Sequence, residues 1–252
     1  LLWDEGLSAS LVEKFFGMEW GDWASSLEVD DRITAAIRVQ GWIFLALAGA
    51  VLVPIRHLAF RSLYLVATLN LIFLAWLKYH DAGMAIAQFY EHASQFLLPA
   101  ILFMALGGRR WIPVAKAALA ATFIGHGLYA LGWTSEWMWF SHPRPGDFTE
   151  MTMICLGIES ESAAENLLVV AGAVDLAAAA GLVFGAKVRS LSLSYMVVWG
   201  ALTALARPWS KFDPHAAAES LFRWIPELLY RVPHFVLPLC ILLALRSKKA
   251  NE

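Results

Sequence analysis

The segment Thr122-Phe-Ile-Gly-His-Gly-Leu-Tyr-Ala-Leu-Gly132 decides how the rest of the chain is interpreted. It ends an apolar run that begins at Ile112, and at about 1.5 Å per residue this run is long enough to cross a lipid bilayer. His126 lies inside the run between Gly125 and Gly127. An ionisable side chain at membrane depth is unfavourable, and a functional role is its default interpretation. The alternative is a helix-packing notch in which His126 is hydrogen-bonded to a neighbouring helix.

The composition is that of an integral membrane protein. The chain has 252 residues, of which 59% are hydrophobic and 16% are charged, and its mean hydropathy is +0.58. A soluble domain has about 25% charged residues and is less apolar. The sequence contains no basic patch of the kind that binds nucleic acid, so we expect no nucleic-acid partner. The two cysteines, Cys155 in a predicted loop and Cys240 in an apolar run, predict neither a disulfide nor a metal site.

Apolar segments predict an all-α, polytopic bundle of seven transmembrane helices. They cover residues 34–54, 58–78, 89–107, 112–132, 163–184, 187–206 and 227–246. Ser162-Ala-Ala-Glu165 forms a capping box where the fifth segment begins. That segment is rich in alanine and glycine, so we expect it in the interior of the bundle.

The ends of the chain lie outside this bundle. Residues 1–33 are acidic and aromatic, and they predict an amphipathic segment at the outer membrane surface. The chain begins at Leu1 rather than at a methionine, so we expect that a preceding part is missing or was removed. Residues 247–252 are predicted to form a cytoplasmic tail.

The loop charges predict the orientation of the bundle. The first, third and fifth loops and the C-terminal tail are basic, whereas the N-terminal segment and the other loops carry nearly all the aspartate and glutamate. Basic residues mark the cytoplasmic side of a membrane. We therefore expect an outer N-terminus, an inner C-terminus and a multi-pass location in the bacterial inner (cytoplasmic) membrane.

Polar side chains concentrate in the outer half of the predicted bundle, and the inner half is almost purely apolar. A channel or a proton path needs polar residues in both halves, so this asymmetry argues against either. It predicts a polar pocket that opens to the outer face. The candidate ligand-binding residues are His126, His92, His234, Arg231, Glu91, Gln95, Tyr129, Arg38 and Asp175.

Three interpretations of this pocket remain open. His92, His126 and His234 come from three different segments and suggest a metal site together with Glu91, or two axial ligands of a haem, although their spacing contains no ligand motif. A quinone headgroup pocket, with a few hydrogen-bond donors among apolar walls, fits the same residues. In the third interpretation the acidic and basic side chains only pair with one another and hold the helices together.

An internal repeat is also suggested. The segment Gln95-Phe-Leu-Leu-Pro-Ala-Ile-Leu-Phe-Met-Ala-Leu106 aligns with His234-Phe-Val-Leu-Pro-Leu-Cys-Ile-Leu-Leu-Ala-Leu245. Both copies run in the same direction, which is typical of a repeat about an axis along the membrane normal. Pro99 and Pro238 occupy equivalent positions, and each is expected to kink its helix.

The second half of the chain resembles the DoxX-like superfamily of four-helix membrane proteins. The resemblance is carried by Gly125-His-Gly-Leu-Tyr-Ala-Leu-Gly132, by Leu156-Gly157 and by Leu167-Leu-Val-Val-Ala-Gly-Ala-Val-Asp-Leu176 with Gly185 beyond it. It covers about residues 112–246. The superfamily includes subunits of a thiosulfate:quinone oxidoreductase and the membrane portion of vitamin-K-dependent carboxylase-like proteins.

This resemblance implies a membrane bundle with a quinone-linked or accessory role. Residues 34–107 would then be a three-span addition that partly duplicates the four-span bundle of 112–246. The two cysteines do not form a redox pair, so thiol chemistry is not expected.

The first functional hypothesis is a quinone- or haem-associated redox module in which His126 orients the ligand, with His92, His234 and Arg231 around it. The second is a non-catalytic accessory subunit that binds other membrane-protein subunits. The third is a small-solute transporter, which the apolar inner half argues against. The sequence identifies no catalytic residue, substrate or oligomeric state.

Overall fold

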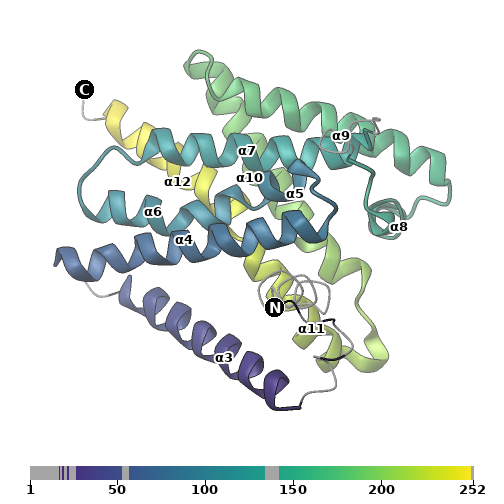
Figure 1. Ribbon diagram of the computed structural model, residues 1–252. Helices are drawn as coiled ribbons and strands as arrows, with labels where there is room; N and C mark the ends of the chain where they lie inside the picture. Colours follow the sequence, from purple (N-terminus) through teal and green to yellow (C-terminus); the bar gives the residue numbers. More distant parts are fainter. Residues whose placement is uncertain are drawn as a thin grey trace.

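The computed structural model describes residues 27–52, 57–133 and 142–250, together with Gly17, Glu19 and Asp22. The regular elements of this part of the chain are all helices, which confirms the all-α class. In chain order they are α3 (Leu27–Ala50), α4 (Leu58–Asp81), α5 (Ile86–Glu91), α6 (Ala93–Leu106), α7 (Ile112–Leu131), α8 (Gly146–Leu156), α9 (Glu161–Gly181), α10 (Ala186–Ser210), the 3-10 helix η2 (Pro214–Ala216), α11 (Ala217–Arg231) and α12 (Pro233–Ala250) (Figure 1).

Five helical segments among the described residues are long and apolar enough to cross a membrane, and the protein is a membrane protein of the all-α class. These segments are Leu58–His80, Ile112–Leu131, Glu161–Gly181, Ala186–Ser210 and Pro214–Ser247, and they correspond to five of the predicted spans.

The predicted spans 34–54 and 89–107 do not reach the length of a membrane span. The apolar stretch of α3, Ala35–Ala50, is shorter, and the other region is interrupted at His92, which leaves α6 with 14 residues. The number of seven spans therefore stays a prediction, and the amphipathic segment predicted for 1–33 lies largely outside the described residues.

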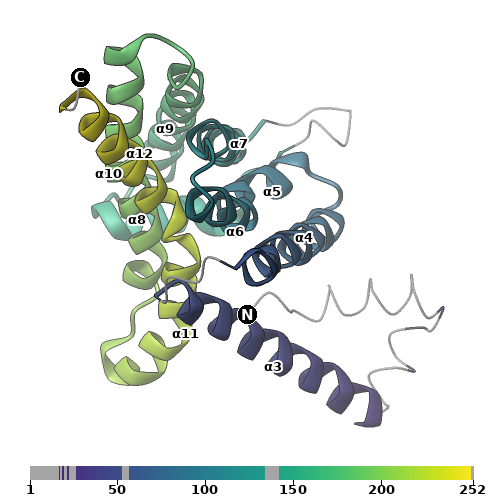
Figure 2. The same ribbon diagram turned by 90° about the vertical axis from the view of Figure 1, so that its left-hand side faces the viewer.

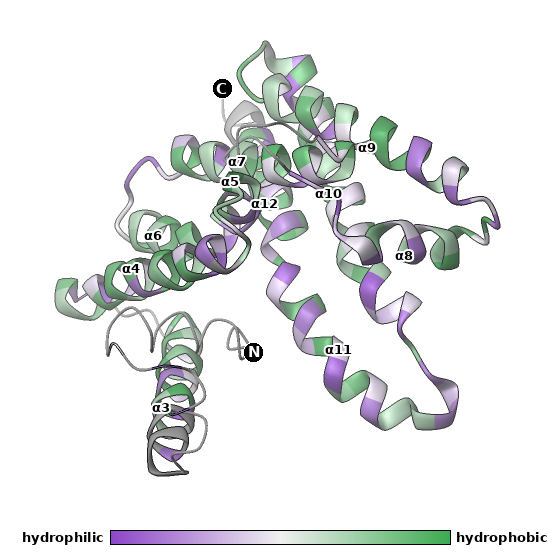
Figure 3. Cartoon of the chain, turned by 45° about the vertical axis from the view of Figure 1, so that its right-hand side comes forward, coloured by the Kyte–Doolittle hydropathy of each residue, from purple (hydrophilic) through white to green (hydrophobic). Residues whose placement is uncertain are grey.

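Helix α7 is the centre of the fold. It packs on α9 along one side and on α5 and α6 along the other, and α12 contacts both α6 and α7. Helix α10 packs on α12, and α4 packs on α6 (Figures 1 and 2). Helix α3 lies at the edge against α4. Figure 3 shows that hydrophilic and hydrophobic residues are mixed along α11, whereas α6 is mostly hydrophobic.

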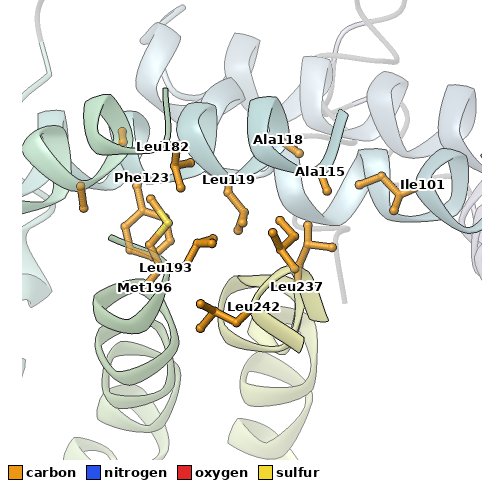
Figure 4. Packing of buried hydrophobic residues seen from close by; sticks show 13 residues of the cluster. Ile101, Ala115, Ala118, Leu119, Phe123, Leu182, Leu193, Met196, Leu237 and Leu242 are labelled. Atoms are coloured by element: carbon orange, nitrogen blue, oxygen red, sulfur yellow. The ribbon is translucent and has the colours of Figure 1, made fainter. Parts of the chain in front are cut away.

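The apolar core lies where α7, α10 and α12 meet. Leu119, Leu193 and Ile241 are fully buried there, one from each of these helices. Leu182, Phe123 and Met196 belong to the same cluster (Figure 4). Lipid is as apolar as these side chains, so close van der Waals packing rather than water exclusion stabilises this contact.

Glycines set the closest helix contacts of α7. A Cβ atom on Gly127 would lie 2.9 Å from the carbonyl oxygen of Gly172 in α9, and one on Gly125 would lie 2.8 Å from the carbonyl oxygen of Ala87 in α5. Each distance is below a real van der Waals contact, so only glycine allows the backbones to approach this closely. The two glycines beside His126 therefore bind α7 to a different neighbour on each side.

The small residues of α9 predicted a position in the interior of the bundle, and this prediction is wrong. The most apolar window of α9 is 28% buried, whereas that of α7 is 50% buried. Among the small residues of α9, Gly172 packs on α7 and Gly181 packs on α10, whereas Ala173, Ala177 and Ala180 are exposed. A row of small residues thus predicted the close contact correctly and the central position wrongly.

Two local predictions need correction. Helix α9 is capped by Ser160, whose side chain accepts a hydrogen bond from the backbone N–H of Ala163, so it starts before the predicted Ser162. Cys155 lies in α8 rather than in a loop, and both it and Cys240 are free thiols. Helix α12 continues into the predicted tail as far as Ala250.

We expect Gly127→Ala to destabilise the protein, because the added methyl group would meet the backbone of α9. Overpacking of this kind typically costs about 1–3 kcal/mol, which is roughly 2–10 °C in Tm for a chain of this size. Thermal unfolding of the purified protein in detergent measures the change. Gly49→Ala is the matched control, because a Cβ atom there meets nothing within 4 Å. An equal Tm for both variants would contradict the close contact.

Candidate functional site

A cavity of about 1630 Å³ lies between α7, α8, α9, α10 and α11, with α3, α4 and α5 on its further side. Its walls are mostly apolar. Its polar side chains are those of Gln40, Lys78, Gln88, Glu91, His92, His126, Tyr129, Thr152, Asp175, Thr203, Arg207, Glu227, Tyr230 and Arg231. A typical small-molecule site measures about 300–1,000 Å³, so this cavity has room for a headgroup and a long apolar tail.

His126 faces this cavity and is half-buried. Its ring lies edge-on to that of His234, with centroids 5.0 Å apart and an interplanar angle of 85°. Within the described part of the chain it makes no hydrogen bond, unlike the histidines around it. The packing-notch interpretation therefore holds for Gly125 and Gly127 but does not account for the imidazole, which is available to a ligand.

A chain of hydrogen bonds runs along one wall from α7 through α5 to α11. The Tyr129 hydroxyl donates to Gln88 Oε1 at 3.1 Å. Gln88 Nε2 in turn contacts Glu91 Oε1 and lies 3.0 Å from His92 Nε2. His92 Nδ1 lies 3.0 Å from the Tyr230 hydroxyl.

The side chains of Gln95 and His234 lie at the break between α5 and α6, next to this wall. Helix α5 ends at Glu91 and α6 begins at Ala93, and the His92 carbonyl between them accepts from the backbone N–H groups of Gln95 and Phe96. With its amide oxygen accepting from His234 Nε2 at 2.8 Å, Gln95 donates to the backbone oxygens of Glu91 and His92. This orientation satisfies both the nitrogen and the oxygen of the Gln95 amide. Gln95 and His234 are buried behind the cavity wall rather than lining it.

Charged side chains connect α8, α10 and α11 at the rim of the cavity. Arg231 donates to Glu227 Oε2 at 2.7 Å. Arg207 pairs with Asp147 at 3.2 Å and with Glu227 at 3.8 Å. These ion pairs are the helix-holding contacts of the third interpretation. Glu91 does not belong to this group, since its partners in the described structure are Gln88 and, at 3.4 Å, His92.

Two further candidates are separate from these clusters. Asp175 is buried in α9 and accepts a hydrogen bond from the Tyr195 hydroxyl at 2.8 Å, so it lines the cavity with its carboxylate already partnered. Arg38 is exposed on α3 and does not line the cavity.

The histidines do not fit a metal ion or a haem. Among the described residues, no group of three His, Cys, Asp or Glu side chains is arranged to hold a metal. Two axial haem ligands each need a free ring nitrogen that points at the iron. Both ring nitrogens of His92 are in hydrogen bonds, and His234 uses its Nε2 for Gln95. His234 is also buried behind the cavity wall, so of these three histidines only His126 presents to the cavity a ring without a hydrogen bond to the described residues.

Gln88 and Tyr230 were not among the residues predicted from the sequence, although the internal repeat contains a signal for both. The spacing of 139 residues between Gln95 and His234 continues upstream. It pairs Gln88 with Glu227, Glu91 with Tyr230 and His92 with Arg231, and all six side chains line the cavity.

The repeat also agrees with the helix arrangement. The pairs α5–α6 and α11–α12 both break just before the repeated segment, and α4 packs on α6 as α10 packs on α12. Gln95 and His234, which occupy equivalent positions, bond directly to each other.

The fold and the cavity thus define an all-α membrane protein with a mostly apolar cavity, one wall of which carries a chain of hydrogen-bonded side chains. No family model, no curated protein and no solved structure matches the chain. The resemblance to the DoxX-like superfamily stays a prediction.

We expect Gln95→Leu and His234→Leu each to lower the free energy of unfolding, because each leaves a buried polar partner without a hydrogen bond. The loss is typically about 1–3 kcal/mol for each variant. In the double variant the loss should be smaller than the sum by about 0.5–3 kcal/mol, since the partners no longer need each other. Chemical unfolding of all four proteins in detergent measures this coupling. Strictly additive losses would show that the two side chains are not partners.

Proposed function

We propose that this protein binds a quinone-class amphiphile, with the ligand's carbonyl headgroup at His126 and its apolar tail along the remaining walls of the cavity. The observation that carries the proposal is the uncommitted imidazole of His126 in a large and mostly apolar cavity. His126 is half-buried and faces the cavity, and an ionisable side chain without a hydrogen-bond partner is unfavourable at membrane depth. A ligand that accepts or donates a hydrogen bond there removes this penalty.

The distribution of polar and apolar side chains on the cavity walls suits a ligand with one polar end. The hydrogen-bonded side chains from Gln88 to Tyr230 lie on one wall, whereas Leu71, Leu202 and Phe212 belong to apolar regions of the lining. A quinone has carbonyl oxygens in a flat ring and an apolar chain, so both of its ends find complementary walls. A haem is not part of the proposal, because the histidines do not provide a pair of free ring nitrogens.

The proposal includes the orientation in the membrane. The polar side chains of the cavity come from the ends of α4, α7 and α10 for which the loop charges predict the outer face. We therefore place the site in the outer half of a seven-span bundle in a bacterial inner membrane, with the N-terminus outside. A redox role of the DoxX-like type follows if the bound quinone exchanges electrons with a partner.

Two other functions are alternatives to ligand binding. The first is an accessory subunit that binds no ligand, and the second is a transporter. The accessory role, in which other membrane subunits bind the apolar flanks, does not require a cavity or an unpartnered histidine. The transporter needs a polar path through the inner half, where α7 and α12 pack against each other through Leu119 and Ile241. Both alternatives have less support than ligand binding.

We expect His126→Phe to weaken quinone binding about tenfold, because it keeps a ring against His234 but removes the hydrogen bond to the ligand. The measurement is the dissociation constant of decylubiquinone for the purified protein, from quenching of tryptophan fluorescence. His215→Ala is the control, since His215 is exposed and lies outside the cavity.

Similar affinities of wild type and His126→Phe would remove His126 from the binding site. Absence of saturable binding by the folded wild-type protein would refute the proposed function as a whole.

A further inference from the structure

The direction of each hydrogen bond along the cavity wall follows from the groups themselves. A carbonyl oxygen can only accept, so the Tyr129 hydroxyl donates to Gln88 Oε1. This contact turns the Gln88 NH₂ group toward Glu91 and His92. The opposite orientation would place the amide oxygen against the Glu91 carboxylate oxygen, and two acceptors repel each other.

The Gln88 amide fixes the tautomer of His92. One N–H of Gln88 is directed to Glu91 Oε1, and the other reaches His92 Nε2 at 3.0 Å. An amide nitrogen has no lone pair to offer, so His92 Nε2 must accept. The competing contact, from a protonated Nε2 to Glu91 Oε1, is longer at 3.4 Å. A neutral histidine that accepts at Nε2 carries its hydrogen on Nδ1.

The tautomer of His92 in turn sets the role of Tyr230. Since Nδ1 of His92 carries the hydrogen, it donates to the Tyr230 hydroxyl oxygen at 3.0 Å. Tyr230 makes no other hydrogen bond with the described residues, and it lines the cavity. Its own hydroxyl hydrogen is therefore left to donate to whatever occupies the cavity.

We propose that Tyr230 determines which ligands the site accepts. Because it is held as a donor, the site favours a ligand that presents a hydrogen-bond acceptor there. A quinol hydroxyl can also accept, but it carries a hydrogen of its own that needs an acceptor, whereas a carbonyl oxygen only accepts. Among quinone-class molecules the site therefore favours the oxidised carbonyl. This inference rests on the proposed function and makes it more specific. Gln88 and His92 act as positioning residues, since they fix the direction of the chain without being the donor to the ligand.

The tautomer of His92 can be measured without any ligand. In ¹⁵N-histidine-labelled protein we expect the His92 signal, assigned by its loss in His92→Gln, to show the hydrogen on Nδ1. Gln88→Met removes the donor to Nε2 and leaves Glu91 as the acceptor, so the hydrogen should move to Nε2. An Nε2-protonated His92 in the wild-type protein would overturn the inference, because Tyr230 would then donate to His92.

The ligand preference is the second test. Tryptophan quenching gives the dissociation constant of decylubiquinone, and competition against decylubiquinone gives that of its quinol. The quantity compared is the ratio of the quinol constant to the quinone constant. We expect Tyr230→Phe to reduce this ratio about tenfold through weaker quinone binding, the effect of one hydrogen bond. Tyr64→Phe is the matched control, since the Tyr64 hydroxyl donates to the backbone oxygen of Leu47 and Tyr64 does not line the cavity.

The outcomes separate this inference from the proposed function. A ratio that Tyr230→Phe leaves unchanged, or an equal loss of affinity for both forms, overturns the inference even if His126 proves essential. Absence of saturable binding of either form by the folded wild-type protein refutes the proposed function and with it the ligand preference. The histidine spectra would then still decide the direction of the hydrogen-bond chain.

Discussion

Backbone contact at Gly125 and Gly127 is the constraint on which the site depends. Gly127 meets the backbone of α9 at Gly172, and Gly125 meets the backbone of α5 near Ala87. These contacts fix α7 between its two neighbours, and they leave His126, the residue between the glycines, facing the cavity. Larger residues at either position would separate α7 from α5 or α9 and would move the imidazole away from the polar wall.

The polar wall itself follows from the cost of unsatisfied groups in a membrane. At the break at His92 the Gln95 amide donates to the backbone oxygens of Glu91 and His92 while it also binds His234. His234 then packs its ring against His126. Gln95, His234, Gln88 and His92 thus hydrogen-bond to one another or to the backbone, whereas His126 has no hydrogen bond within the described part of the chain. This contrast, more than the number of polar residues, distinguishes a binding site from a set of helix-holding contacts.

Much of the fold could be predicted from the sequence, because helix length and hydropathy are local properties. These properties identified most of the long apolar helices, among them α4, α7, α9 and α10. The glycines beside His126 correctly indicated close helix packing. The break at His92 and the edge position of α9 depend on contacts with other helices, which hydropathy does not contain. Gln88 and Tyr230 were missed because their roles arise only when α5 and α11 meet, although the repeat had already placed polar residues at equivalent positions.

The most direct test of the account is to analyse what the protein retains when it is purified from its own membrane. A solvent extract of the gently solubilised protein is examined by chromatography and mass spectrometry for quinones, lipids and haem, and the amounts are related to protein. The account predicts close to one quinone per chain, well above its share in the total membrane extract. An extract that contains only bulk lipid in its membrane proportions would contradict the claim that the cavity at His126 is a quinone site.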